Sequence, residues 1–248
     1  MPKPIPSRTG ETKTAAAFVQ RLEKHRSAAE AKKLQGYFKM GAGEYAEDDI
    51  FMGVRMGQVF ALAKEFIDMK PAEIARLLKN PIHEIRIGGL SIMDKQARSK
   101  KTTPERRKEL FDLYFKCIDG INNWDLVDVS APHVVGGYLF DKPRQLLYKL
   151  ARSKNVWERR TAIVSTAYFI RQGEYSDTFR IAELLVKDKH DLIHKAAGGW
   201  LREAGKHDRP RLLQFLDKHA ATMPRVFLRY AIEHLDKKMR EHYLSLGK

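Results

Sequence analysis

The sequence predicts an all-α fold. Proline and capping residues mark several helix starts, and apolar residues recur at intervals of three and four positions. No long stretch alternates between apolar and polar residues as a half-buried strand does. The chain has 248 residues and a 43% hydrophobic content, which is enough to build one large domain or one continuous array of repeats.

Three helix starts are marked by their end residues. Ser27-Ala-Ala-Glu30 is a capping box, in which each side chain can satisfy a backbone N–H of the other residue. The segment 71–80 begins with proline and ends with asparagine, as many helices do. Thr103-Pro104-Glu105 opens a further helix, whose apolar positions are Leu110, Leu113, Tyr114 and Cys117.

The helices also show signs of repetition. Four amphipathic segments begin with a basic residue that small or apolar residues follow, at intervals of about 35 to 75 residues. These basic residues are Arg86, Arg160, Lys195 and Arg229. One or two helical pairs per interval predict a HEAT-like α-α superhelix, a curved solenoid of antiparallel helical pairs. We expect residues 1–12 to be a flexible N-terminal segment and residues 13–248 to form a single HEAT-like repeat domain.

The four basic residues have two interpretations. On one concave side they would form a stripe that follows a phosphate backbone. Individually, each is equally well explained as part of a solvated helix face. Their recurrence at one repeat position favours the stripe.

Charge points to a phosphate-rich partner. Lys and Arg number 46 against 31 Asp and Glu, so the formal net charge is +15, which is the electrostatic pattern of a protein that binds nucleic acid. The single cysteine, Cys117, cannot form an internal disulfide and indicates a reducing compartment. With no apolar leader at the start and no membrane-length apolar stretch, we expect a cytoplasmic, nucleoid-associated protein.

One motif is suited to chemistry on such a partner. Asn122-Asn123-Trp124-Asp125-Leu126-Val127-Asp128 opens a predicted helix and places Trp124 and Asp128 four positions apart, on one helix face. In a purely structural interpretation Asn122 or Asn123 is the N-cap and Trp124 a packing anchor, while Asp128 is an exposed acid or the partner of a nearby arginine.

Several segments together give the chain a family resemblance. In their order and spacing, they are similar to the AlkD-type DNA alkylation-repair glycosylases from about residue 15 onward. The segments are Tyr37-Phe-Lys-Met-Gly-Ala-Gly-Glu-Tyr45, Phe51-Met-Gly-Val-Arg55, Trp124-Asp-Leu-Val-Asp128, Glu158-Arg-Arg-Thr-Ala-Ile163, Leu201-Arg-Glu203, Met223-Pro-Arg225 and Arg229-Tyr-Ala-Ile232.

The resemblance implies a HEAT-like fold that cups duplex DNA and hydrolyses the bond between an N3- or N7-alkylated purine, such as 3-methyladenine or 7-methylguanine, and its deoxyribose. It assigns Asp128 as the catalytic aspartate and Trp124 as the residue that contacts the sugar. It further places Tyr37 near the lesion and Arg160 at the DNA face, where the alternative for Arg160 is an ion pair with Glu158 or Asp128. Lys195, Arg229, Arg86 and Trp200 complete the expected DNA contacts, although Trp157 and Trp200 are also typical of helix packing.

The chain departs from the family pattern at Lys195-Ala-Ala-Gly-Gly-Trp-Leu-Arg-Glu203. Matching Lys195 and Arg202 to the pattern puts Gly199, rather than Trp200, at the second active-site tryptophan. A one-residue shift turns a helical side chain by about 100°, so Trp200 faces another direction unless the helix is overwound.

We therefore expect a monofunctional alkylpurine glycosylase that acts on double-stranded DNA as a monomer, with no cofactor, no metal and no obligate protein partner. Nine histidines show no convincing metal-ligand spacing. A non-catalytic HEAT-like protein that recognises bent or branched DNA is the alternative, motivated by Gly199. A protein-binding solenoid shares the fold but does not explain the charge.

Overall fold

The computed structural model describes residues 13–247 and confirms the all-α prediction. Within this range the regular elements are helices, and one isolated parallel bridge joins Ile50 and Ile82. The expected flexible segment 1–12 lies outside the described residues. Contacts divide the chain into two compact units, Met1–Gln96 and Ala97–Lys248, within the range expected to form one domain.

The helices of unit 1 are α1 (Ala15–Glu23), α2 (Ala28–Tyr37), α3 (Met56–Glu65), α4 (Pro71–Leu78) and α5 (His83–Arg98), whose last two residues belong to unit 2. Two of these helices, α2 and α4, begin where the sequence predicts. The Ser27 side chain caps α2 by accepting from the backbone N–H of Glu30, and Pro71 occupies the first turn of α4. Helix α1 packs against α3 and α4, and Phe18 meets Phe66 edge to face in the core.

A buried carboxylate fixes the segment before α3. Glu84 accepts hydrogen bonds from the backbone N–H groups of Met52, Gly53 and Val54, at 3.1, 2.8 and 3.2 Å. Gly53 has φ of +82°, and a Cβ there would lie 1.9 Å from the carbonyl oxygen of Ser27. Only glycine permits both this backbone conformation and this approach of α2.

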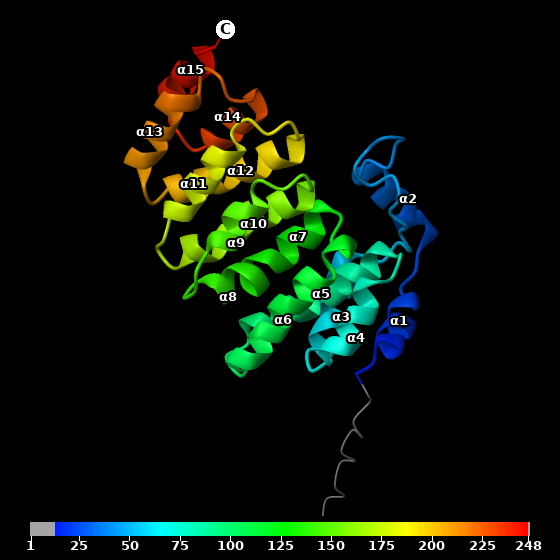
Figure 1. Ribbon diagram of the computed structural model, residues 1–248. Helices are drawn as coiled ribbons and strands as arrows, with labels where there is room; N and C mark the ends of the chain where they lie inside the picture. The colour runs from blue at the N-terminus through cyan, green and yellow to red at the C-terminus, as the bar shows by residue number, and fades with distance from the viewer. Residues whose placement is uncertain (1–12, 248) are drawn as a thin grey trace, which may run out of the picture. The chain divides into compact units, whose positions relative to one another are not determined.

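Unit 2 is a stack of helical pairs (Figure 1). Its helices are α6 (Pro104–Lys116), α7 (Trp124–Ala131), α8 (Gly137–Leu139), α9 (Gln145–Leu150), α10 (Val156–Arg171), α11 (Ser176–Leu185), α12 (Asp191–Gly205), α13 (Arg209–His219), α14 (Arg225–Ala231) and α15 (Lys237–Ser245). Helices α7, α10, α12 and α14 contact one another in succession, while α11 packs on α10 and α12, and α13 on α12. Successive contacting pairs of this kind are the arrangement expected of HEAT-like repeats.

The helix that begins at Trp124 changes its winding after Ala131. A π-helical turn, η2 (Pro132–Gly136), separates α7 from α8. Pro132 has no N–H to donate to the carbonyl of Asp128, its partner in a regular α-helix. Such turns are frequent at functional sites, and this one directly follows α7.

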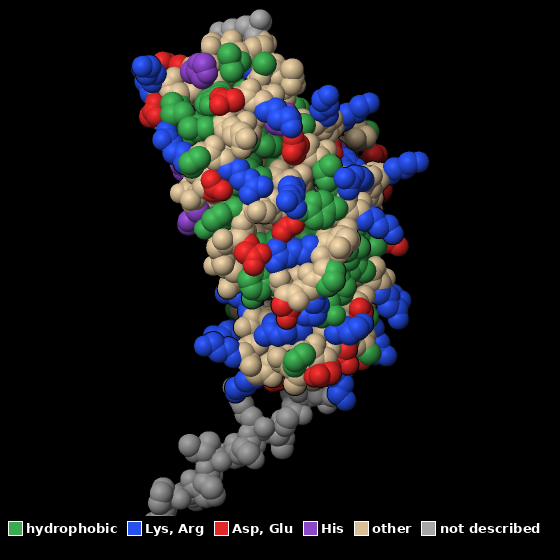
Figure 2. All heavy atoms as spheres, turned by 60° about the vertical axis from the view of Figure 1, so that its left-hand side comes forward, with side chains coloured by type: hydrophobic (Ala, Val, Ile, Leu, Met, Phe, Trp, Pro, Cys, Tyr) green, Lys and Arg blue, Asp and Glu red, His purple; other side chains and the backbone are tan. Residues whose placement is uncertain are grey.

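Charged side chains are frequent on the face of the molecule that Figure 2 shows. Figure 2 shows Lys and Arg side chains spread over one face, with Asp and Glu side chains among them. None of the helices in the described part of the chain has the length and apolar character needed to cross a bilayer.

Candidate active site

Helix α7 presents Trp124 and Asp128 on one side. The Asn123 side chain accepts from the backbone N–H of Trp124 at 2.7 Å and forms the N-cap of the helix, so Asn123 is the capping residue of the two candidates. The other side of α7 is buried and includes Leu126, Val127, Ser130 and Ala131. This packing fixes the direction in which the partly exposed Asp128 points.

Arg160, from α10, holds the Asp128 carboxylate with both ends of its guanidinium group. Nε donates to Oδ1 at 2.9 Å, and Nη2 donates to Oδ2 at 2.7 Å. The exposed fraction is 38% for the Asp128 side chain and 8% for that of Arg160. The arginine therefore lies behind the acid, and the bidentate contact fixes the plane of a carboxylate that solvent can still reach.

The third contact of Arg160 reaches α12. Its Nη1 donates to the backbone carbonyl of Leu192 at 2.7 Å. Residues from α7, α10 and the first turn of α12 thus meet around one guanidinium group, and α10 packs against both α7 and α12. An arginine can make these three contacts at once because its donors form a rigid planar fork, which the single ammonium of lysine lacks.

Burial and charge act on Asp128 in opposite directions. Burial raises the pKa of Asp128 above the ordinary value of 3.8, while the charge and hydrogen bonds of Arg160 lower it and leave a smaller net increase. The buried Tyr114 hydroxyl lies 2.8 Å from the Thr161 hydroxyl. Burial raises the pKa of Tyr114, the nearby charge of Asp128 adds to that increase, and Tyr114 remains a neutral phenol at neutral pH.

Three further predicted residues also lie in unit 2. Lys195, on α12, forms an ion pair with Asp191 at 2.6 Å, one turn earlier in the same helix. Trp200 is partly exposed on α12, and Arg229 is exposed on α14, the next helix of the stack. Asp128 contacts Arg160 directly and shares α7 with Trp124, so these three residues form the candidate site. Trp157, at the start of α10, is only 9% exposed.

Two predicted residues lie in unit 1. Tyr37, at the end of α2, is 64% exposed and packs edge to face on Phe38. Arg86 is buried, and its guanidinium group contacts Asp49 at 2.5 Å and the carbonyl of Pro81 at 2.7 Å.

The predicted exposed stripe is therefore wrong for two of its four members. The guanidinium groups of Arg86 and Arg160 are both occupied by carboxylates and backbone carbonyls. Both arginines lie on helices, as expected. Their guanidinium groups, however, bind neighbouring groups of the protein instead of facing solvent. Lys195 and Arg229 keep exposed or partly exposed positions.

The glycine pair in α12 has two different environments. A Cβ at Gly198 would lie 2.6 Å from the carbonyl oxygen of Phe227 and 2.7 Å from Cβ of Tyr230. A Cβ at Gly199 would meet only Cδ1 of Tyr230, at 4.0 Å. Close packing of α14 thus requires glycine at 198, whereas position 199 has room for a side chain.

Four groups in this region had no role in the sequence prediction of the site. The Leu192 carbonyl is a backbone group and leaves no signal in the sequence, and Tyr114 and Thr161 read as ordinary core positions. The exposed aromatic Tyr230 lies beside the glycine pair; it is part of the segment Arg229-Tyr-Ala-Ile232, but the sequence predicted no DNA contact for it. Among residues 13–247, no group of three or more His, Cys, Asp or Glu residues is placed to hold a metal ion.

Comparison with known proteins identifies the family. A family model described as "DNA alkylation repair enzyme" matches residues 18–235. A predicted DNA alkylation repair enzyme from Enterococcus faecalis is similar in structure, with a TM-score of 0.66 and 15% identity over 86% of this chain and 98% of that chain. AlkD2 from Streptococcus mutans gives a TM-score of 0.46 and 16% identity, over 90% of this chain and 100% of that chain.

No curated protein matches this sequence significantly. The structural likeness to the Enterococcus protein, at 15% identity, supports the fold. The family model covers most of the chain and includes α7, α10 and α12, which surround Arg160. The chain belongs to the DNA alkylation repair enzyme family.

Proposed function

We propose that this protein is a monofunctional DNA glycosylase that releases N3- and N7-alkylated purines, such as 3-methyladenine and 7-methylguanine, from double-stranded DNA. The observation that supports the proposal is the Asp128 carboxylate, which Arg160 fixes from behind while its other side stays open to solvent. Trp124 lies one helical turn earlier on the same face.

The chemistry of an alkylated purine suits a single oriented carboxylate. Alkylation at N3 or N7 makes the base cationic, so the electrons of the C1′–N bond can leave with it and yield a neutral base. The sugar then passes through an oxocarbenium-like state, which Asp128 stabilises electrostatically and the indole face of Trp124 stabilises as a cation–π partner. A water molecule adds to C1′ and gives up a proton; in this proposal Asp128 orients that water and accepts the proton.

This reaction differs from the hydrolysis of an O-glycoside. There, a second carboxyl group must protonate a poor leaving group, whereas a cationic purine leaves without that help. The role of Arg160 is to orient the Asp128 carboxylate. It does not add to the electrostatic stabilisation, because its positive charge partly offsets the negative field of Asp128. Lys195, Arg229, Trp200 and Tyr37 are the proposed DNA contacts, and DNA binding is therefore expected to weaken as the salt concentration rises.

Base release from alkylated DNA tests the proposal. The protein is incubated with duplexes that contain 7-methylguanine or 3-methyladenine, and free base is measured by chromatography. Asp128→Asn should lower the rate by roughly 10²- to 10³-fold, the usual cost of losing one electrostatic group at the transition state. Asp125→Asn is the matched control, because Asp125 lies on the same helix and accepts from the backbone N–H of Leu126; it should release base at the wild-type rate.

A second function is favoured by Gly199, which has no side chain at the position of α12 where the family resemblance expects the second active-site tryptophan. In that case the protein binds bent or branched DNA without cleaving the glycosidic bond. Salt-dependent DNA binding with no base release would support this alternative and reject the glycosylase. Equal release by wild type and Asp128→Asn, with both shown to be folded by thermal unfolding, would remove Asp128 from the mechanism.

A further inference from the structure

Helix α12 begins with an unusual capping residue. His190 has extended backbone angles, and its Nδ1 accepts a hydrogen bond from the backbone N–H of Leu192 at 3.2 Å. Helices α1, α2, α6, α7, α10, α13 and α15 are capped instead by Ser, Thr, Asn or Asp side chains, which are the usual N-cap residues. An imidazole accepts at Nδ1 only while that nitrogen is unprotonated.

The capped residue is the one that holds Arg160. Leu192 donates its N–H to His190, and its carbonyl accepts from Nη1 of Arg160 at 2.7 Å. Arg160 in turn makes both hydrogen bonds to Asp128. A continuous set of contacts therefore runs from the imidazole of His190 through one residue of α12 to the Asp128 carboxylate.

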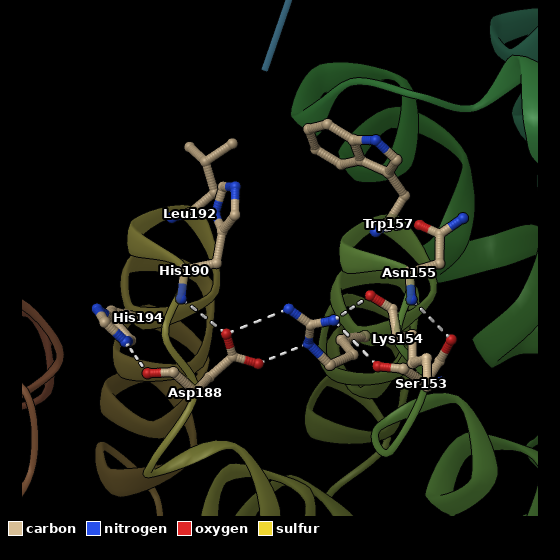
Figure 3. Close-up of polar contacts among 9 residues, drawn as sticks. Ser153, Lys154, Asn155, Trp157, Asp188, His190, Leu192 and His194 are labelled. Atoms are coloured by element: carbon tan, nitrogen blue, oxygen red, sulfur yellow. Dashed lines mark hydrogen bonds and ion pairs between the residues drawn. The ribbon is translucent and has the colours of Figure 1, made fainter. Parts of the chain in front are cut away.

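The loop before α12 holds His190 in place (Figure 3). Asp188 Oδ1 accepts from the backbone N–H of His190 at 2.8 Å, and the Asp188 carbonyl lies 2.6 Å from Nε2 of His194. Arg159 of α10 binds the Asp188 carboxylate at 2.6 Å and also donates to the carbonyls of Ser153 and Lys154. The loop is thus tied to the start of α10, and the imidazole has a defined position relative to the Leu192 N–H.

The charged and titratable groups that face His190 come from three elements. Asp188 lies in the loop, Arg159 on α10, and Asp191 and His194 on α12. Burial lowers the pKa of His190 below its ordinary value of 6.5, and Arg159 and His194 act in the same direction. Asp188 and Asp191 oppose that shift without reversing it. The neutral, capping form is therefore dominant at and above pH 6.5.

We infer that His190 is a titratable positioning residue, whose neutral imidazole holds the first turn of α12 and, through the Leu192 carbonyl, the Arg160 that orients Asp128. Protonation at Nδ1 replaces the acceptor with a donor and directs it at the N–H of Leu192. The cap is then lost, and the Leu192 carbonyl loses its fixed position. His190 does not touch the reacting atoms.

The sign of the pH effect follows from the lowered pKa. The folded chain takes up this proton less readily than the unfolded chain, so stability from the cap is fully present above pH 6.5 and is lost as the pH falls through the lower pKa of the folded state. Activity that depends on an ordered Arg160 should fall over the same acidic range.

Amide exchange tests the cap without reference to any activity. Hydrogen exchange of the Leu192 amide is measured by NMR across pH 5–8, after correction for the intrinsic pH dependence of exchange. In the wild type, protection of this amide should fall by roughly fivefold as His190 titrates. His190→Asn, which keeps a capping acceptor that does not titrate, should give protection independent of pH, and His190→Ala should give low protection throughout. His207→Asn is the matched control, since His207 stacks on Tyr175 and makes no contact with Leu192 among the described interactions.

The second measurement rests on the proposed function. The acid side of the pH profile for base release should flatten in His190→Asn relative to wild type, while His207→Asn leaves the profile unchanged. The inference would be overturned if protection of the Leu192 amide in the wild type did not change with pH, or if the acid side of the pH profile for base release were the same in His190→Asn as in the wild type. Absence of base release at every pH would reject the glycosylase instead, and the exchange result would still decide the role of His190.

Discussion

Arg160 binds Asp128 through two parallel hydrogen bonds, and the arginine is the buried member of the pair. The exposed fractions of 8% and 38% show that the acid is partly exposed and that the arginine lies behind it. This order is the reverse of a surface arginine that shields a buried acid. It leaves the carboxylate available to a ligand and makes the arginine a support rather than a direct contact.

Arg160→Lys should weaken both the fold and the site. A lysine keeps the charge but cannot form the two bonds to Asp128 and the bond to the Leu192 carbonyl together. We expect the free energy of unfolding to fall by about 1–3 kcal/mol, measured by urea denaturation, and the rate of base release to fall with it. Arg209→Lys, at an exposed pair with Asp236, should change stability by less than about 0.5 kcal/mol. Equal effects of the two variants would contradict a special role for Arg160.

Alanine at Gly198 and at Gly199 should have opposite effects. At 198 the new Cβ meets the Phe227 carbonyl at 2.6 Å, so α12 and α14 must separate, at a cost of about 1–3 kcal/mol. At 199 there is room, and alanine should stabilise the helix by about 0.5–1 kcal/mol. Thermal unfolding of the two variants checks the pair, and destabilisation at both positions would show that Gly199 is also required by packing.

Tyr114→Phe should show a pH-dependent loss of stability. The variant loses the contact with the Thr161 hydroxyl and should be less stable by about 1 kcal/mol at neutral pH. Because burial raises the pKa of Tyr114 in the folded state, its stabilisation is complete below the ordinary pKa of 10 and is lost as the pH rises above that value. The difference between wild type and variant should therefore shrink as the pH rises above 10. Tyr175→Phe serves as the control, and a constant difference would contradict the assignment.

Glu84→Gln should loosen the segment 52–54 in unit 1. The carboxylate accepts from three backbone N–H groups, and an amide replaces one acceptor oxygen with a donor. We expect the free energy of unfolding to fall by about 2 kcal/mol, and the amide protection of Gly53 and Val54 to fall as well. Glu65→Gln, at an exposed ion pair with Arg21, should leave both quantities near wild type. Unchanged protection of Gly53 would contradict the role given to Glu84.

The local features of the fold could be predicted because their causes are local. Ser27, Pro71 and Thr103 each fix a helix start through bonds or backbone angles within four residues, and all three helices begin as expected. The four-residue spacing of Trp124 and Asp128 likewise places them on one face of α7.

The partners of the basic residues Arg86 and Arg160 depend on contacts between distant segments of the chain. Arg86 and Arg160 look alike as basic residues at the start of amphipathic segments, yet both are buried, with Asp49 and Asp128 as their respective partners. Nothing in the order of residues distinguishes a solvated arginine from one that a carboxylate 32 or 37 positions away will bind.

The sequence by itself determined the all-α class, the helix starts and the shared face of Trp124 and Asp128, because periodicity and capping act over a few residues. Only the tertiary structure decided that Arg160 lies behind Asp128, that the Leu192 carbonyl completes its coordination, and that Gly198 and Gly199 differ. Those properties arise where α7, α10, α12 and α14 pack against one another, and packing between helices depends on backbone atoms and distances that the order of residues does not specify.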